Sequence, residues 1–203
     1  MKLDVFYSYA CRDSYLTFAW LQQVQQQTPT LLSKWRPFAI QIDNAHEYWA
    51  RNWETANSEL RGFMAAEAAR QQGAEAFQRF HAALEGAVHE QLRELGDQRT
   101  LLDVAQQVNL EVDRFQTAWR DPELVRKIHK SHQEAIRKFS VFGTPTLVFP
   151  NNRAYHVELT RIPPEANALE TFHTIETLAT KALSTAIALG QHRPLIKRFP
   201  GIC

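Results

Sequence analysis

The pattern of hydrophobic and polar positions predicts two strand-containing ends that flank a helical middle. The first part of the chain shows an apolar run over residues 3–7, an amphipathic helix over residues 14–27 and an alternating run over residues 38–43. A helix that joins two strands of one sheet makes a right-handed crossover, so these strands are predicted to be parallel. Residues 44–57 lack a clean period and are predicted to form a loop with a helical turn, in which Trp49 and Trp53 act as packing anchors.

The middle of the chain is predicted to be helical throughout. Its apolar stripes indicate helices over residues 60–72, 74–95, 112–119 and 123–138. A further helix carries residues 101–108, and Asp97 is predicted to cap it. Gly73 and Gly96 are predicted to end the first two of these helices. Because no strand pattern interrupts the series, it is typical of a helical module inserted into another fold.

Strand patterns return after the helical middle. Residues 146–149 and 154–159 are separated by a turn and predict an antiparallel hairpin, and a helix follows over residues 165–189. The order is therefore βαβ, helical insertion, ββα, which predicts an α/β fold. We expect residues 1–57 and 140–203 to form one domain and residues 58–139 to form the insertion.

Composition excludes several classes of protein. The 23 basic and 22 acidic residues give a formal net charge of +1, which is not typical of nucleic-acid-binding or membrane-surface proteins. No apolar run has the length of a membrane span. Two cysteines cannot build the disulfide framework of a small secreted protein, and the N-terminus lacks the apolar core of a signal peptide. We therefore expect a cytoplasmic protein with reduced thiols.

Cys11 lies where the first strand ends and the first helix begins. The N–H groups and the dipole at a helix N-terminus favour a thiolate over a thiol. The charge of Arg12 acts in the same direction, and that of Asp13 acts against it. The residue types alone leave two interpretations open: a reactive thiol, or an inert cysteine buried between strand and helix.

This arrangement resembles the thioredoxin superfamily, because a cysteine follows the first strand and Thr144-Pro145 leads into the third. The helical insertion narrows the resemblance to the DsbA-like branch, which includes DsbA, FrnE-type proteins, kappa-class glutathione transferases and 2-hydroxychromene-2-carboxylate isomerases. The resemblance covers nearly the whole chain and is carried by residues 4–7, 11–16, 65–73 and 141–148. It implies that Pro145 follows a cis peptide bond, and that the backbone of Thr144 faces the thiol and pairs with an extended substrate.

Position 14 departs from the dithiol members of this branch, which carry Cys-x-x-Cys where this chain has Cys11-Arg12-Asp13-Ser14. A single thiol cannot form the internal disulfide of dithiol exchange, so single-thiol chemistry is expected. Ser14 is placed beside Cys11 as a catalytic residue that donates a hydrogen bond to a sulfur. Arg12, Asp13, Thr144 and Pro145 are assigned to substrate binding.

Three functions follow from the resemblance. The first is a DsbA-like thiol-disulfide oxidoreductase that acts through one nucleophilic cysteine on protein or small-molecule thiols. The second is a glutathione-dependent transferase or isomerase, with the loop of Trp49 and Trp53 and the helical insertion forming an apolar pocket. The third is a binding protein with an idle Cys11. We expect no bound cofactor, and glutathione or another small thiol as a cosubstrate. The kappa-like relatives leave a homodimer open.

Other polar residues receive weaker assignments. Cys203 is an exposed terminal residue that would act as a resolving thiol only if the tail reached Cys11. The pairs His129 with His132 and Glu85 with His89 have helical spacing but lie among polar residues, so they are interpreted as solvated faces and no metal is assigned. The basic residues of the tail either dock a glutathione carboxylate or are solvated: His192, Arg193, Lys197 and Arg198.

Overall fold

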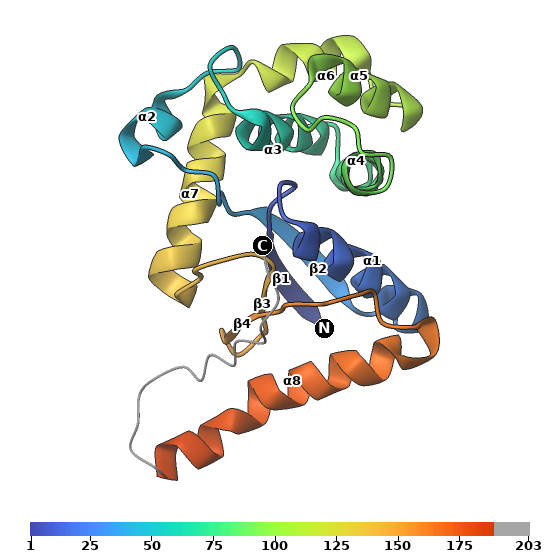
Figure 1. Ribbon diagram of the computed structural model, residues 1–203, viewed down its shortest axis with the longest axis vertical. Coiled ribbons are helices and arrows are strands. Elements are labelled where there is room, and N and C mark those ends of the chain that lie inside the picture. Colours follow the sequence, from blue (N-terminus) through green and yellow to red (C-terminus); the bar gives the residue numbers. More distant parts are fainter. Residues whose placement is uncertain (189–203) are drawn as a thin grey trace.

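The structure, a computed structural model, describes residues 1–188, with side chains described as far as Ala179. The elements in chain order are β1 (Lys2–Tyr7), α1 (Arg12–Gln27), β2 (Leu32–Pro37), α2 (Ala45–Ala50), α3 (Ser58–Arg70), α4 (Ala74–His89), α5 (Gln98–Gln107), α6 (Val112–Trp119), α7 (Pro122–Phe139), β3 (Thr146–Val148), β4 (Ala154–His156) and α8 (Glu165–Ala188). Strands from both ends of the sequence meet in one sheet. In Figure 1, α3 to α6 lie beyond one end of the strands, and α7 runs from there alongside the sheet. This order confirms the predicted α/β fold with a helical insertion.

The sheet has the order β2-β1-β3-β4. β1 is parallel to β2, with Val5 opposite Trp35, and antiparallel to β3, with Val5 opposite Leu147. β3 and β4 form the predicted antiparallel hairpin. Successive side chains of a strand point to opposite faces, and both faces of β1 are covered: Val5 packs in the larger core cluster and Phe6 in a second, smaller one. A buried central strand therefore leads directly into the turn before Cys11.

The second strand lies earlier in the sequence than the predicted range of residues 38–43. β2 is an edge strand that ends at Pro37, a residue without the N–H group that a sheet ladder needs. The N–H groups of Ile40 and Gln41 bind the carboxylate of Glu59, at 2.9 and 3.0 Å, instead of a neighbouring strand. The alternating run is therefore a loop that a side chain holds in place.

The helices of the insertion lie close to their predicted ranges, with one exception. α4 ends at His89 rather than at residue 95, and Leu92, which was expected on its apolar stripe, is 84% exposed with a φ of 56°. Gly96 has a φ of 83°, and a Cβ atom there would lie 2.6 Å from the Cα of Ser58. Close approach of two backbones therefore requires glycine at this position.

The two tryptophans between β2 and α3 are packing anchors, as predicted. Trp53 is 4% exposed and stacks on Trp119 of α6, with ring centroids 4.3 Å apart and planes 7° apart. Trp49, in the short helix α2, stacks on His129 of α7 at 4.4 Å. Because Trp53 is covered by this contact, its ring does not line an open apolar pocket of the kind that the transferase hypothesis requires.

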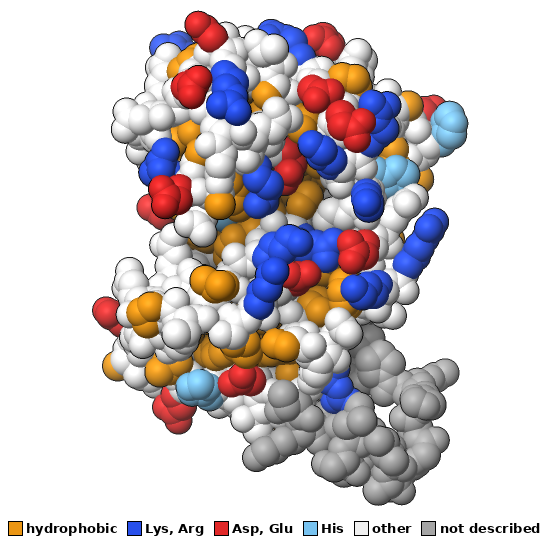
Figure 2. All heavy atoms as spheres, turned by 180° about the vertical axis from the view of Figure 1, so that it is seen from behind, with side chains coloured by type: hydrophobic (Ala, Val, Ile, Leu, Met, Phe, Trp, Pro, Cys, Tyr) orange, Lys and Arg blue, Asp and Glu red, His pale blue; other side chains and the backbone are white. Residues whose placement is uncertain are grey.

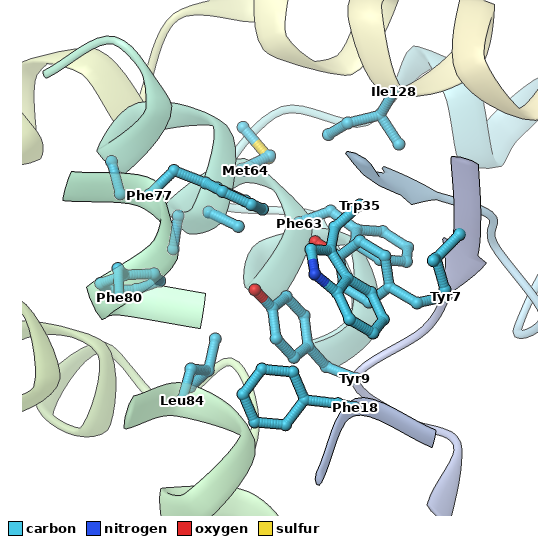
Figure 3. Close-up of a cluster of buried hydrophobic side chains, with 14 of the residues drawn as sticks. Tyr7, Tyr9, Phe18, Trp35, Phe63, Met64, Phe77, Phe80, Leu84 and Ile128 are labelled. Atoms are coloured by element: carbon cyan, nitrogen blue, oxygen red, sulfur yellow. The ribbon is translucent and has the colours of Figure 1, made fainter. Parts of the chain in front are cut away.

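One cluster of buried side chains runs from the sheet into the insertion (Figure 3). Tyr7 and Trp35 of the sheet meet Phe63 of α3 and Phe77 of α4 in this cluster. The ring centroids of Tyr7 and Phe63 are 5.7 Å apart, with the rings edge to face. The two predicted domains, residues 1–57 with 140–203 and residues 58–139, thus share a core. Their division into separate domains stays a prediction.

On the face opposite that of Figure 1, basic and acidic side chains of the described residues lie close together. Figure 2 shows Lys and Arg side chains across the middle of this face with Asp and Glu side chains among them. Arg36, for example, binds both Asp4 and Glu134. Among residues 1–188, no helix is long and apolar enough to cross a membrane.

Candidate active site

Cys11 is the N-cap residue of α1 and is partly exposed. Its φ of −109° and ψ of 115° are extended, and its carbonyl accepts hydrogen bonds from the N–H groups of Ser14 and Tyr15, at 3.1 and 3.4 Å. No side-chain hydrogen bond caps the helix. The thiol is therefore carried on the N-cap residue of α1, immediately before the first turn of the helix, and the backbone of that turn holds the residue in place.

Thr144 faces Cys11 from the other end of the sequence. The Cys11 thiol donates a hydrogen bond to the Thr144 carbonyl, with 3.3 Å between sulfur and oxygen, and the Thr144–Pro145 peptide bond is cis. The Val157 N–H donates to the Pro145 carbonyl at 3.0 Å, and the Thr146 hydroxyl donates to the Gly143 carbonyl at 2.8 Å. The loop before β3 is thus tied to its neighbours and presents one carbonyl to the thiol.

Ser14 makes a different contact from the predicted one. Its side chain is fully buried, and its hydroxyl oxygen accepts a hydrogen bond from the Ser8 N–H at 3.2 Å. The hydrogen bond of the Cys11 sulfur goes to Thr144, so Ser14 supports the turn before the thiol in this structure. A contact between Ser14 and a substrate sulfur stays a prediction.

Ser8, which the sequence analysis did not select, is the centre of the turn that leads to Cys11. Its carbonyl accepts the Cys11 N–H at 3.1 Å, and its hydroxyl oxygen accepts the Ala10 N–H at 3.1 Å. Together with the bond from its N–H to Ser14, these contacts place three groups of one fully buried residue within the turn. The sequence signal that could have identified Ser8 is its position within the otherwise aromatic run of residues 6–9.

Arg12 and Asp13 lie on the first turn of α1, where Arg12 is exposed and Asp13 is partly buried. Burial raises the pKa of Asp13, and Glu158 raises it further, while Arg12 and His156 oppose this shift. Asp13 therefore lies within electrostatic reach of β4 and the residues after it. His156 was not predicted: its Nε2 lies 3.4 Å from Glu158, and a Cβ atom on Gly143 would lie 3.3 Å from its ring.

Helix α4 covers the other flank of the Cys11 turn. The Tyr9 hydroxyl and Nδ1 of His81 form a hydrogen bond of 2.8 Å, and Nε2 of His89 lies 3.0 Å from the Tyr9 carbonyl. The Tyr15 ring stacks on His89 with centroids 5.1 Å apart. The inserted helices thus contact the residues on both sides of Cys11 directly.

The histidine and carboxylate pairs are not solvated helix faces, which corrects the prediction. Glu85 is fully buried and His132 is 9% exposed. Burial, followed by the neighbouring His129, lowers the pKa of His132 to about 4. These groups pack against the interior, and no cluster of three or more side chains suited to a metal ion is found in the described part of the chain.

Several predictions concern residues outside the described part of the chain. These are the predictions for Cys203, His192, Arg193, Lys197 and Arg198.

Comparison with known proteins concerns the family and the fold of the chain. The family model of the DSBA-like thioredoxin domain matches residues 2–173. No curated protein sequence matches the chain.

Solved structures resemble the chain in fold at low sequence identity. The cytosolic disulfide reductase DsbM from Pseudomonas aeruginosa, solved with GSH, superposes with a TM-score of 0.63 at 14% identity and covers 88% of this chain and 100% of its own. A thioredoxin-like oxidoreductase from Silicibacter pomeroyi DSS-3 has a TM-score of 0.58 at 20% identity, with coverage of 87% and 86%. Pseudomonas aeruginosa DsbA has a TM-score of 0.56 at 16% identity, with coverage of 92% and 85%. These likenesses concern the fold, and the family match covers most of the sequence, so this chain belongs to the DSBA-like thioredoxin domain family.

Proposed function

We propose that this protein is a thiol-disulfide oxidoreductase that works through Cys11 as its single nucleophile. The observation that carries the proposal is the hydrogen bond from the Cys11 thiol to the Thr144 carbonyl, which joins residues from opposite ends of the fold at 3.3 Å. A substrate sulfur that bonds to Cys11 reaches the same loop. Pro145 and the Thr144 side chain are buried, so the part of this loop that is proposed to meet an extended substrate is the Thr144 backbone.

The proposed reaction is a thiol-disulfide exchange in two steps. The Cys11 thiolate attacks one sulfur of a substrate disulfide, a bond forms between Cys11 and that sulfur, and the other sulfur leaves as a thiolate. A second thiolate then attacks the substrate sulfur of this mixed disulfide. The attack releases Cys11 and forms a new disulfide, so no net oxidant is consumed.

Because Ser14 stands where a second cysteine would be, the second thiol must come from another molecule. The position three residues after Cys11 holds a hydroxyl, which cannot form a disulfide. We propose glutathione, or another small thiol, in this role, and a cytoplasmic location in which such thiols are reduced. The similarity in fold to a cytosolic disulfide reductase that was solved with GSH supports both proposals. The substrate of that reductase is not assigned to this chain.

Arg12 and Asp13 are proposed to contact the substrate. Arg12 is exposed beside the thiol, and Asp13 lies in reach of His156 and Glu158 across the site. An exposed cation next to Cys11 suits a substrate that carries a carboxylate, as glutathione does.

The test uses a glutathionylated peptide as substrate and reduced glutathione as the second thiol. In a Cys203→Ala background, release of the glutathionyl group should depend on Cys11 and disappear in Cys11→Ser. Reduction of insulin should be weak and should rise in Ser14→Cys, which restores two thiols. A Cys11→Ser variant with full activity would contradict the proposed nucleophile.

The other two hypotheses give different results in the same assay. A glutathione-dependent transferase would conjugate glutathione to an aromatic electrophile and leave the peptide glutathionylated. A protein that only binds its partner would show neither activity.

A further inference from the structure

Glu59 is a fully buried carboxylate at the start of α3, and four donors surround it. Its Oε1 accepts the Ser8 hydroxyl at 2.6 Å and the Ile40 N–H at 2.9 Å. Its Oε2 accepts the Gln41 N–H at 3.0 Å and the Tyr48 hydroxyl at 3.1 Å. Burying a charge is costly unless such donors replace water, and here each oxygen has two.

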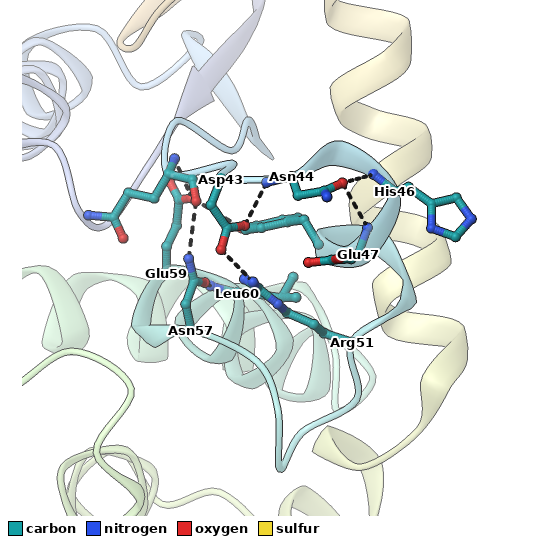
Figure 4. A network of polar contacts seen from close by, with 10 residues as sticks. Asp43, Asn44, His46, Glu47, Arg51, Asn57, Glu59 and Leu60 are labelled. Carbon is teal, nitrogen blue, oxygen red and sulfur yellow. Dashed lines mark hydrogen bonds and ion pairs between the residues drawn. The ribbon is translucent and has the colours of Figure 1, made fainter.

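These donors come from segments that are far apart in the sequence. Figure 4 shows Glu59 beside the loop that precedes α2, with Asp43, Asn44 and Arg51 forming a separate polar network at the surface. The Ser8 donor belongs to the turn before Cys11. Glu59 therefore links the first helix of the insertion to the turn that carries the thiol.

We propose that Glu59 is a positioning residue for Cys11 and acts through the Ser8 hydroxyl. This inference takes from the proposed function only that Cys11 is the reacting group. A hydroxyl has one hydrogen and two lone pairs. When Ser8 donates its hydrogen to Glu59, the rotation of the hydroxyl is fixed and a lone pair accepts the Ala10 N–H, one residue before the thiol.

The consequence concerns the electrostatic surroundings of the sulfur. N–H groups at the start of a helix favour a thiolate that lies close to them, so the position of the sulfur relative to α1 matters. The Cys11 N–H is held by the Ser8 carbonyl, and that carbonyl belongs to the residue that Glu59 anchors. Loss of the anchor should leave the helix intact and loosen the turn that aims the thiol.

Tyr48 offers a matched control for this chain of contacts. Ser8→Ala and Tyr48→Phe each remove one hydroxyl donor from Glu59, but only Ser8 belongs to the Cys11 turn. Burial, followed by the charge of Glu59, raises the pKa of Tyr48, so its hydroxyl remains a donor across the working pH range. A role confined to stability predicts the same behaviour for both variants.

The experiment measures alkylation of Cys11 by iodoacetamide at neutral pH in a Cys203→Ala background, together with the melting temperature. Both variants should melt at a lower temperature. Only Ser8→Ala should slow alkylation, by about tenfold, because only Ser8 belongs to the turn that orients the thiol; a tenfold change corresponds to about 1.4 kcal/mol of lost thiolate stabilisation. Ser8→Thr, which keeps the hydroxyl, should restore the rate.

Equal alkylation rates in Ser8→Ala and Tyr48→Phe would overturn the positioning role, as would failure of Ser8→Thr to restore the rate. Glu59→Gln adds a second line of evidence: its effect on the rate should not add to that of Ser8→Ala. If Glu59→Gln does not fold, the Ser8 and Tyr48 pair decides alone. Because alkylation needs no disulfide substrate, a wild-type protein inactive toward glutathionylated peptide would refute the proposed function without affecting this comparison.

Discussion

Glu85 provides a sharp test of how the insertion packs against the Cys11 turn. It lies on α4 and is fully buried, and neither carboxyl oxygen has a hydrogen-bond partner among the described residues. Nε2 of His89 is 3.5 Å away. Burial raises the pKa of Glu85 well above its ordinary 4.5 and lowers the pKa of His89. Both shifts favour the neutral groups, so we interpret the contact as one between uncharged side chains rather than an ion pair.

The perturbation is Glu85→Gln, which keeps the size of the side chain and removes its titration. In the unfolded chain Glu85 loses its proton near pH 4.5, whereas the folded protein retains it to higher pH. The contribution of Glu85 to stability therefore falls as the pH rises above this value, by about 1.4 kcal/mol per pH unit until the pKa in the folded state is passed. The free energy of unfolding of Glu85→Gln, relative to wild type, should rise over the same range at the same slope.

The assay is urea denaturation of both proteins at several pH values between 4.5 and 8. Glu75→Gln, on the exposed first turn of the same helix, controls for the loss of a carboxylate from α4. A difference between Glu85→Gln and wild type that stays constant with pH would refute the reasoning. So would a difference that Glu75→Gln reproduces, because burial would then not be its cause.

Two further substitutions test the packing of the insertion. Asp97 accepts both the N–H and the hydroxyl of Thr100 at the start of α5, so Asp97→Ala should lower the free energy of unfolding by about 1 kcal/mol in urea titrations. These bonds lower the pKa of Asp97 below 3.8. Its contribution to the free energy of unfolding is therefore present above this pH and is lost as the pH falls through the folded-state pKa. An Asp97→Ala variant that differs from wild type equally at pH 7 and pH 2 would contradict this reasoning. Trp119→Ala should lower the free energy of unfolding by roughly 3–5 kcal/mol, because a fully buried ring that stacks on Trp53 is removed. An increase in the near-ultraviolet circular dichroism signal or an unchanged urea midpoint would contradict this prediction.

The pattern of the sequence predicted the elements well where local signals act. Asp97 caps α5 as expected, and the range of residues 112–119 predicted α6. The prediction of a strand over residues 38–43 was wrong, because an alternating pattern also occurs in a loop. Here two N–H groups of this range bind the carboxylate of Glu59 instead of a neighbouring strand. Periodicity reports which side chains are buried and does not report what the backbone binds.

The candidate site was only partly accessible to sequence reasoning. Cys11 could be selected from its position between a strand and a helix, but Thr144 lies 133 residues away and was reached through family resemblance alone. Ser8 and Glu59 were missed because their bond joins two ordinary polar residues 51 positions apart. No local pattern marks a serine whose hydroxyl is fixed by a distant carboxylate.

The central claim, that Cys11 is a lone exchanging thiol, is tested most directly by mass spectrometry of the intact protein under non-reducing conditions. The protein is incubated with oxidised glutathione, and peptide mapping locates any adduct. We predict one glutathione on Cys11, its removal by excess reduced glutathione, and no adduct at this site in Cys11→Ser. A protein that carries no glutathione on Cys11, or that carries it on Cys203 alone, would contradict the claim.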